Sequence, residues 1–282
     1  MTQESAITLA HSPDSDDAFM FYALAEGRVD TEGLTFSHEL SDIETLNRRA
    51  LAAELEVTAV SIHAYAHLAD RYALLSSGCS MGDGYGPRLV SKSPAPADPR
   101  AGAQGKRVAI PGTLTTAYLS LKLFQPEFQP VVVPFDQIED AVAMGQVDLG
   151  LLIHEGQLTF QDQGFHLWAD MGAWWLAETG LPLPLGGNAI RRDLGPRVMS
   201  QVARDLKASI EYALAHRGPA LSHAKQFNRG LTDARTDTFV GMYVNHWTVD
   251  YGVRGRKAVQ LLLDRGFEAG IIPKKVTVEF IG

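Results

Sequence analysis

The chain has 282 residues, of which 45% are hydrophobic and 21% are charged, and its formal net charge is −8 at neutral pH. This length suits two lobes, and the acidic balance argues against nucleic acid or an anionic membrane as a partner. The single cysteine, Cys79, excludes intrachain disulfides and cysteine-based metal sites.

The N-terminal stretch MTQESAITLAHSPDSDD contains neither the basic nor the apolar region of a secretory signal. No apolar run approaches the roughly 20 residues that a membrane-spanning helix needs. We therefore expect a cytoplasmic protein that has no membrane partner.

Strand and helix patterns alternate over the first two thirds of the chain. Apolar positions of period two, or short apolar runs, predict strands at 6–12, 34–40, 56–61, 72–77, 87–93, 107–110, 130–135 and 149–153. Positions that repeat every 3.6 residues predict helices at 13–27, 42–54, 62–70, 115–124 and 138–146. This alternation indicates an α/β fold, in which ligands bind beyond the carboxyl ends of the strands.

Two segments predict where the chain passes between lobes. Residues 94–104, PAPADPRAGAQ, are rich in proline, alanine and glycine and form the expected linker. The prolines and glycines of GLPLPLGGNAIRR (180–192) mark turns around a returning strand. The expected division is a discontinuous lobe 1 of residues 1–95 and 190–282, with lobe 2, residues 96–189, inserted. Helices expected at 196–217, 233–247 and 255–265 complete lobe 1.

The first polar junction is HSPDSDDAF at residues 11–19, where Asp14, Ser15, Asp16 and Asp17 stand between a strand and a helix. Such side chains are typical of helix N-caps, and acidic groups suit the positive end of a helix. A carboxylate here would equally accept a hydrogen bond from a ligand hydroxyl, so both interpretations stay open. A calcium loop is not expected, because the rest of its pattern is missing.

The second junction, AVSIHAYAH, ends a strand at Ser61, whose hydroxyl either caps the next helix or faces a ligand. His63 and His67 are four residues apart, a spacing at which two histidines on a helix can share a metal. No third ligand accompanies them, so no metal is expected. The glycine-rich GDGYGP at 82–87 lacks the third spaced glycine of a nucleotide loop and is interpreted as a turn.

The third junction is PGTLTTAYLS at residues 111–120. Gly112 permits a tight turn, residues 113–116 offer hydroxyls, and a well-patterned helix follows. The unpaired N–H groups at the start of a helix attract anions. A carboxylate suits this site better than a nucleotide, because no Gly-Lys-Ser/Thr follows.

The fourth junction is GLLIHEGQLTF (150–160), where a buried strand ends on His154 and Glu155. A lone histidine is commonly a structural residue, but a strand end makes His154 a candidate general base. If a helix begins here, its positive end disfavours imidazolium and keeps the ring neutral near pH 7, whereas Glu155 acts in the opposite direction. No serine elbow, cysteine nucleophile or dinucleotide fingerprint competes with it.

Five motifs carry a family resemblance: SPDSDDAF, DIETLNRRAL, GTLTTAY, GLLIHEGQLTF and GAWWLAETGLPLPLG. Over about residues 7–265, the chain resembles the 1,4-dihydroxy-6-naphthoate synthase family of the futalosine pathway of menaquinone biosynthesis. The resemblance implies a periplasmic-binding-protein-like fold of two lobes. It also implies a lyase that converts cyclic dehypoxanthine futalosine, a small-molecule carboxylate, to 1,4-dihydroxy-6-naphthoate without a metal or organic cofactor.

The resemblance further implies which residues act. The family's catalytic base lies in its IHE motif, which is His154 here. Substrate contacts fall in the TTA motif, at the end of the third strand, in the TLN helix and in the first motif: Thr115, Thr116, Ala117, Ala59, Val60, Ser61, Asn47 and Asp17. The family's first motif often reads Pro-x-Asn-Asp, which Asp17 matches and Asp16 does not.

Two other functions fit the same fold. A non-enzymatic solute-binding protein is disfavoured by the expected absence of a signal sequence and by a titratable base in the cleft. The sibling enzyme, chorismate dehydratase, lacks the IHE histidine, so His154 disfavours it. Trp174 and Trp175 either line the cleft or pack the inserted lobe, and the oligomeric state does not follow from the sequence.

Overall fold

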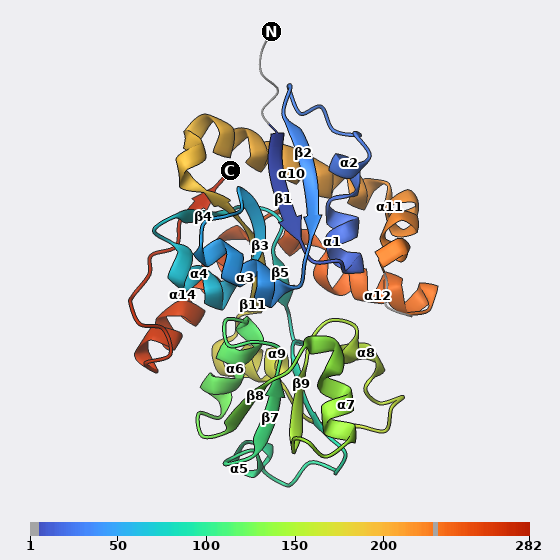
Figure 1. Ribbon diagram of the computed structural model, residues 1–282, viewed down its shortest axis with the longest axis vertical. Coiled ribbons are helices and arrows are strands. Elements are labelled where there is room, and N and C mark those ends of the chain that lie inside the picture. Colours follow the sequence, from blue (N-terminus) through green and yellow to red (C-terminus); the bar gives the residue numbers. More distant parts are fainter. Residues whose placement is uncertain (1–5, 228–230) are drawn as a thin grey trace.

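Two β-sheets, one above the other in Figure 1, organise the computed structural model, which describes residues 6–227 and 231–282. Helices cover the faces of both sheets, so the α/β class predicted from the sequence is confirmed. Residues 1–5 and 228–230, which the expected lobe 1 includes, lie outside the described residues. Within the described part, no helix is both long and apolar enough to cross a bilayer.

The first sheet belongs to the upper lobe of Figure 1 and has the strand order β12-β4-β11-β3-β1-β2, with β5 paired to β11. Strands β1, β2 and β3 are parallel, whereas β11 is antiparallel to β3 and β4. The carboxyl ends of β1 and β3 therefore lie at the same edge. The strands are β1 Ala6–His11, β2 Thr35–Leu40, β3 Val57–Ser61, β4 Tyr72–Leu75, β5 Ser80–Gly82, β11 Leu183–Arg191 and β12 Phe280–Ile281.

The second sheet belongs to the lower lobe and has the order β10-β6-β9-β7-β8. Strands β7, β8 and β9 are parallel, and β6 is antiparallel to β9 and β10. The carboxyl ends of β7 and β9 therefore share one edge. The strands are β6 Arg88–Ser91, β7 Arg107–Ile110, β8 Gln129–Val132, β9 Leu149–Leu152 and β10 His166–Asp170.

Several helices begin where a side-chain oxygen accepts a hydrogen bond from an otherwise unpaired N–H group. Asp42 accepts from the Thr45 amide at the start of α3, and Thr115 accepts from the Tyr118 amide at the start of α6. The first lobe holds α1 Ser15–Met20, α2 Tyr22–Ala25, α3 Ile43–Leu51, α4 Ile62–Leu68, α10 Gly195–Ala215, α11 Arg217–Ala224, α12 Asp233–Tyr243, α13 His246–Val249 and α14 Gly252–Glu268. The second lobe holds α5 Pro99–Gly102, α6 Thr116–Phe124, α7 Ile138–Ala143, α8 Gly156–Thr159 and α9 Met171–Thr179.

The sheets divide the chain at other residues than the sequence analysis expects. Strand β6 pairs with β9 and β10, so residues 88–95 belong to the second lobe, and β11 pairs with β3 and β4, so residues 183–189 belong to the first. The expected linker, 94–104, lies inside the second lobe and contains α5. The chain instead crosses between β5 and β6 and between α9 and β11. These boundaries depend on pairing between strands that are far apart in the sequence, and such pairing cannot be predicted from local composition.

The first crossing is the segment GDGYGP, which the sequence analysis interprets as a turn. Here the Tyr85 carbonyl lies against the Cα atoms of Gly82 and Gly172, at positions where a Cβ atom on either glycine would overlap it. Gly172 belongs to the first turn of α9, so these glycines let that helix pack directly on the crossing segment.

The two adjacent tryptophans pack the second lobe. Trp175 is fully buried, and its indole N–H donates to the Pro182 carbonyl at 3.2 Å. Trp174 is half-buried and meets the Phe124 ring edge-on, with centroids 5.5 Å apart. Neither tryptophan lines the cavity between the sheets, so the packing alternative of the sequence analysis holds.

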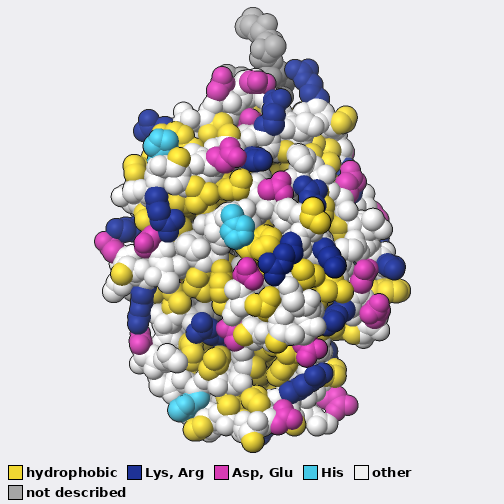
Figure 2. Space-filling model, turned by 180° about the vertical axis from the view of Figure 1, so that it is seen from behind, with side chains coloured by type: hydrophobic (Ala, Val, Ile, Leu, Met, Phe, Trp, Pro, Cys, Tyr) yellow, Lys and Arg dark blue, Asp and Glu magenta, His cyan; other side chains and the backbone are white. Residues whose placement is uncertain are grey.

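The surface carries both signs of charge. On the face seen from behind, basic and acidic side chains alternate around strips of apolar side chains, and no continuous basic surface forms there (Figure 2).

Candidate functional site

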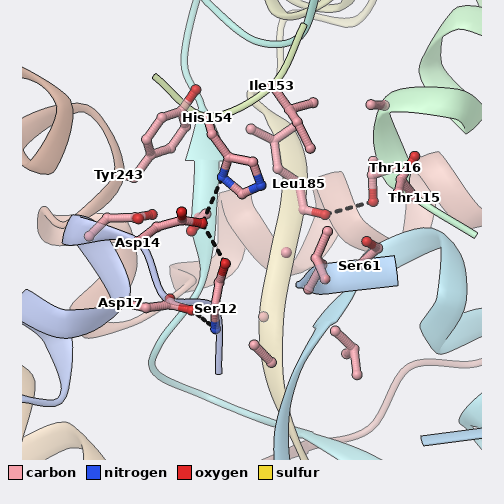
Figure 3. Close-up of a pocket in the computed structure, with 18 of the residues that line it drawn as sticks. Ser12, Asp14, Asp17, Ser61, Thr115, Thr116, Ile153, His154, Leu185 and Tyr243 are labelled. Atoms are coloured by element: carbon pink, nitrogen blue, oxygen red, sulfur yellow. Dashed lines mark hydrogen bonds and ion pairs between the residues drawn. The ribbon is translucent and has the colours of Figure 1, made fainter. Parts of the chain in front are cut away.

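A cavity with about 800 Å³ of empty space, part of it open to solvent, lies between the two sheets (Figure 3). Its wall combines the loops after β1 and β3 with the loops after β7 and β9, because the carboxyl ends of these strands face the gap between the lobes. The returning strand β11 and helix α12 contribute most of the remaining wall. The cavity therefore occupies the place where α/β folds bind ligands.

Eight of the nine residues that the sequence analysis assigns to the site line this cavity: Asp17, Ala59, Val60, Ser61, Thr115, Thr116, Ala117 and His154. The ninth, Asn47, is fully buried behind Ser61. Its amide nitrogen donates to the Ser61 hydroxyl at 3.0 Å, and its oxygen accepts from the Ser61 N–H at 2.9 Å. Asn47 therefore orients Ser61 rather than the ligand. Because the Ser61 hydroxyl accepts the bond from Asn47, its own proton remains available to another acceptor.

Helix α6 points its N-terminus at the cavity. Thr115 caps it, and the Thr116 hydroxyl donates to the Leu185 carbonyl at 2.6 Å and accepts from the His63 N–H at 3.2 Å. These bonds occupy the Thr116 hydroxyl, which the sequence analysis predicts to contact a ligand. The first-turn amides of Thr116 and Ala117 have no intrahelical acceptor, and both residues line the cavity. These N–H groups and the Ser61 hydroxyl are hydrogen-bond donors on one wall of the cavity, and donors at a helix N-terminus favour an anion.

His154 lies on the opposite wall, in the turn after β9, with a left-handed backbone (φ 53°) that is uncommon for a residue other than glycine. Its Nδ1 atom lies 2.9 Å from Asp14 Oδ2, and the Phe135 ring meets it edge-on with centroids 4.8 Å apart. The other nitrogen, Nε2, has no hydrogen-bond partner among the described residues. His154 therefore offers Nε2 to a ligand.

Carboxylates surround this histidine. Burial alone lowers its pKa, but the charge and hydrogen bond of Asp14, followed by Glu155 and Asp16, outweigh burial and raise the pKa to about 9. This raised pKa is opposite to the effect that the sequence analysis expects if the positive end of a helix dominates. Helix α8 has only four residues, Gly156–Thr159, so its positive end is too weak to oppose these charges.

The acidic residues of the first junction are coupled to the same site. Burial and the adjacent Asp14 carboxylate raise the pKa of Asp17 to about 7, and burial with the charges of Asp17 and Asp14 raises that of Asp16 well above its usual range. Asp14 stands at the N-cap position of α1, yet its side chain makes no capping hydrogen bond. Its interaction with His154 replaces the capping role left open by the sequence.

Hydrogen bonds and ion pairs hold the two lobes together around the cavity. The Tyr243 hydroxyl of α12 lies 2.8 Å from the Gln157 amide of α8, and Arg235 pairs with Asp162 at 2.5 Å. With its amide oxygen turned to the His154 N–H, Gln157 also donates to the Gly86 carbonyl at 2.7 Å. The two lobes are therefore in direct contact beside the cavity.

Several cavity residues were not predicted. They include Ser12, Gln157, Tyr243, Phe239 and residues 185–188 of β11. Gly187 lines the cavity and must be a glycine for packing, because a Cβ atom on it would overlap the Tyr251 hydroxyl. Tyr243 and Phe239 belong to α12, far from His154 in the sequence, and no motif around them indicates a ligand site.

The histidine pair of α4 has a structural role. His63 Nδ1 lies 3.2 Å from the Thr115 carbonyl, and burial lowers its pKa to about 4, so the ring is neutral and donates to that carbonyl. Over residues 6–227 and 231–282, no group of three or more histidine, cysteine or acidic side chains is arranged to hold a metal ion.

Comparisons with known proteins match most of the chain. Residues 7–268 match a family model described as menaquinone biosynthesis. A 1,4-dihydroxy-6-naphthoate synthase of Thermus thermophilus is 41% identical over 266 residues, which cover 94% of this chain and 96% of that protein. A protein of the same name from Streptomyces coelicolor is 37% identical over 277 residues, and 95% of each chain is covered.

Solved structures extend the comparison. A crystal structure of a protein from Archaeoglobus fulgidus is 47% identical with a TM-score of 0.90, and the match covers 95% of this chain and 98% of that one. The alkanesulfonate-binding protein of Xanthomonas axonopodis pv. citri, solved with bound MOPS, is 16% identical with a TM-score of 0.70 and coverages of 99% and 98%. The fold is therefore that of periplasmic binding proteins, as predicted.

Proposed function

The chain belongs to the menaquinone-biosynthesis family, and from this membership we propose that it is a cytoplasmic 1,4-dihydroxy-6-naphthoate synthase. The proposed reaction is the carbon–carbon lyase step from cyclic dehypoxanthine futalosine to 1,4-dihydroxy-6-naphthoate. Two relatives that bear this enzyme name cover nearly the whole chain. The observation that carries the proposal is one cavity with the hydrogen-bond donors at the start of α6 on one wall and His154 Nε2 on the other.

In the proposed mechanism, the two walls have separate tasks. The carboxylate of the substrate binds the first-turn amides of α6 and the Ser61 hydroxyl, which fixes the reacting carbon relative to His154. His154 accepts a proton from the substrate through Nε2, and a carbon–carbon bond of the substrate breaks as the aromatic naphthoate forms. Aromatisation supplies much of the driving force, so the protein positions the substrate, moves the proton and excludes water.

The pKa of His154 leads to a pH prediction. A general base acts in its neutral form, and kcat/KM reports the ionisation of the free enzyme. Because the surrounding carboxylates raise the pKa of His154 to about 9, kcat/KM is expected to rise with pH along a limb with a midpoint near 9. Steady-state kinetics from neutral to alkaline pH measure it. A flat profile over that range, or a midpoint at the ordinary pKa of histidine, would contradict the assignment.

The proposed carboxylate site leads to a binding prediction. Ser61→Ala removes a hydroxyl whose proton is free of Asn47, so KM is expected to rise roughly tenfold, the equivalent of about 1.4 kcal/mol, with little change in kcat. Ser120→Ala is a matched control, because that buried hydroxyl donates to the Ala117 carbonyl and does not line the cavity. Equal KM values for the two variants would show that the substrate carboxylate does not bind at Ser61.

A solute-binding protein is the second candidate, because the alkanesulfonate-binding protein, which is named for binding a solute, has the same fold. The purified protein is incubated separately with cyclic dehypoxanthine futalosine and with chorismate, and the products are followed by chromatography and mass spectrometry. The proposal predicts the naphthoate from the first compound and no change in the second. Binding without conversion would favour the solute-binding candidate, and conversion of chorismate would favour the dehydratase.

A further inference from the structure

The partner of His154 comes from the other lobe. Asp14 lies in the loop between β1 and α1 of the first lobe, whereas His154 follows β9 of the second, and their side chains meet across the cavity wall at 2.9 Å (Figure 3). The Asp14 side chain is 1% exposed and that of His154 is 18% exposed. This ion pair is thus largely shielded from solvent, and charges interact more strongly when they are away from water.

Both members of the pair are held from behind. The Ser12 hydroxyl donates to the same Oδ2 atom of Asp14 that faces His154. The His154 backbone is fixed by its left-handed turn, and its N–H donates to the oxygen of Gln157. The Phe135 ring flanks the imidazole. These contacts leave the imidazole one orientation, with Nδ1 toward Asp14 and Nε2 toward the cavity.

We infer that Asp14 is a positioning residue for His154, supplied by the opposite lobe, so that the base is complete only when the lobes are closed. This inference rests on the proposed function for the identity of His154 as the base. The Asp14 carboxylate accepts the Nδ1–H bond and thereby selects the tautomer whose lone pair lies on Nε2. A side chain at the N-cap position of α1 is thus used for the site instead of for the helix.

The proton movement balances as follows. A bond between the substrate and its proton breaks, the Nε2–H bond forms, and the resulting imidazolium is stabilised by the Asp14 carboxylate, which keeps its charge. Asp16, Asp17 and Glu155 also face or adjoin the ring, and each acts in the same direction when it is ionised. Opening of the lobes would remove the Asp14 carboxylate and lower the pKa of His154, so a strong base is formed only around an enclosed substrate.

Asp14→Asn tests the inference, because it keeps the shape and removes the charge. An asparagine amide in place of the carboxylate donates to Nδ1 and moves the ring proton to Nε2, so kcat is expected to fall about 10³-fold or more, while KM changes less than about threefold. Asp14→Glu retains a carboxylate and is expected to recover part of the rate. Asp237→Asn removes a carboxylate that pairs with Arg217 within the first lobe and does not line the cavity, so it is expected to leave kcat unchanged.

Nitrogen-15 NMR of the His154 ring gives a readout that needs no substrate. In the wild-type protein above the pKa of the ring, the Nδ1–H tautomer is expected, and in Asp14→Asn the pKa is expected to fall. The Nε2–H tautomer in the wild type, or an unchanged pKa in Asp14→Asn, would overturn the inference even if the enzyme is active. The expected tautomer and pKa shift in a protein that fails to convert cyclic dehypoxanthine futalosine would support the pair and reject the proposed function.

Discussion

An asparagine in place of His154 is expected to lower kcat by about 10²- to 10⁴-fold, the range that a positioned general base contributes. Asparagine is the informative replacement, because it tolerates the left-handed backbone at this position (φ 53°) and keeps a polar group beside Asp14. KM is expected to change little, since the substrate carboxylate binds at α6 and Ser61 on the other wall. Steady-state kinetics with the cyclic substrate measure both quantities.

The matched control is His67→Asn. His67 is half-buried on α4, contacts His63 with ring centroids 5.8 Å apart and does not line the cavity. Its replacement is expected to leave both kcat and KM near the wild-type values. If His154→Asn retained a rate close to that of His67→Asn, the base would have to be another residue.

The second large effect is on stability. Gly172→Ala is expected to lower the free energy of unfolding by more than about 3 kcal/mol, because its Cβ atom would overlap the Tyr85 carbonyl and the Gly86 amide. These are backbone atoms of the segment that connects the lobes, so they cannot move aside as a flexible side chain does. Urea unfolding followed by circular dichroism measures the change.

Gly218→Ala provides the comparison for this effect. Gly218 lies in α11, and a Cβ atom there would meet nothing within 4 Å. Alanine is expected to be neutral or to stabilise the protein by up to about 1 kcal/mol, because it is the better helix former. Equal unfolding midpoints for the two variants would show that the crossing segment is not tightly packed on α9.

The elements that sequence predicted best are those with strong local signals. The strand expected at 56–61 is β3, Val57–Ser61, and Asp42 caps α3 as its position predicts. Because parallel strands bring their carboxyl ends together, the polar junctions after β1, β3, β7 and β9 could be expected to meet, and eight residues assigned from the family resemblance line one cavity. Periodicity and strand direction were sufficient to place the polar junctions, whereas the individual site residues came from the family resemblance.

Features that depend on distant partners could not be predicted in the same way. The composition of residues 94–104 resembles a linker, yet the preceding strand β6 pairs within the second sheet. Asp14 has the sequence signature of a helix cap, and its actual interaction is with a residue 140 positions later, since 154 − 14 = 140. The raised pKa of His154 could not be predicted for the same reason, because Asp14 outweighs the short helix α8.

Single-turnover kinetics with protein in excess over cyclic dehypoxanthine futalosine test the central claim most directly. The fluorescence of the four tryptophans reports binding, and quenched samples report the naphthoate. We expect the wild type to convert all bound substrate, and His154→Asn to bind it with similar affinity but to release the naphthoate at least about 10²-fold more slowly. A wild-type protein that binds the compound and returns it unchanged, or a His154→Asn variant that converts it at the wild-type rate, would contradict the account.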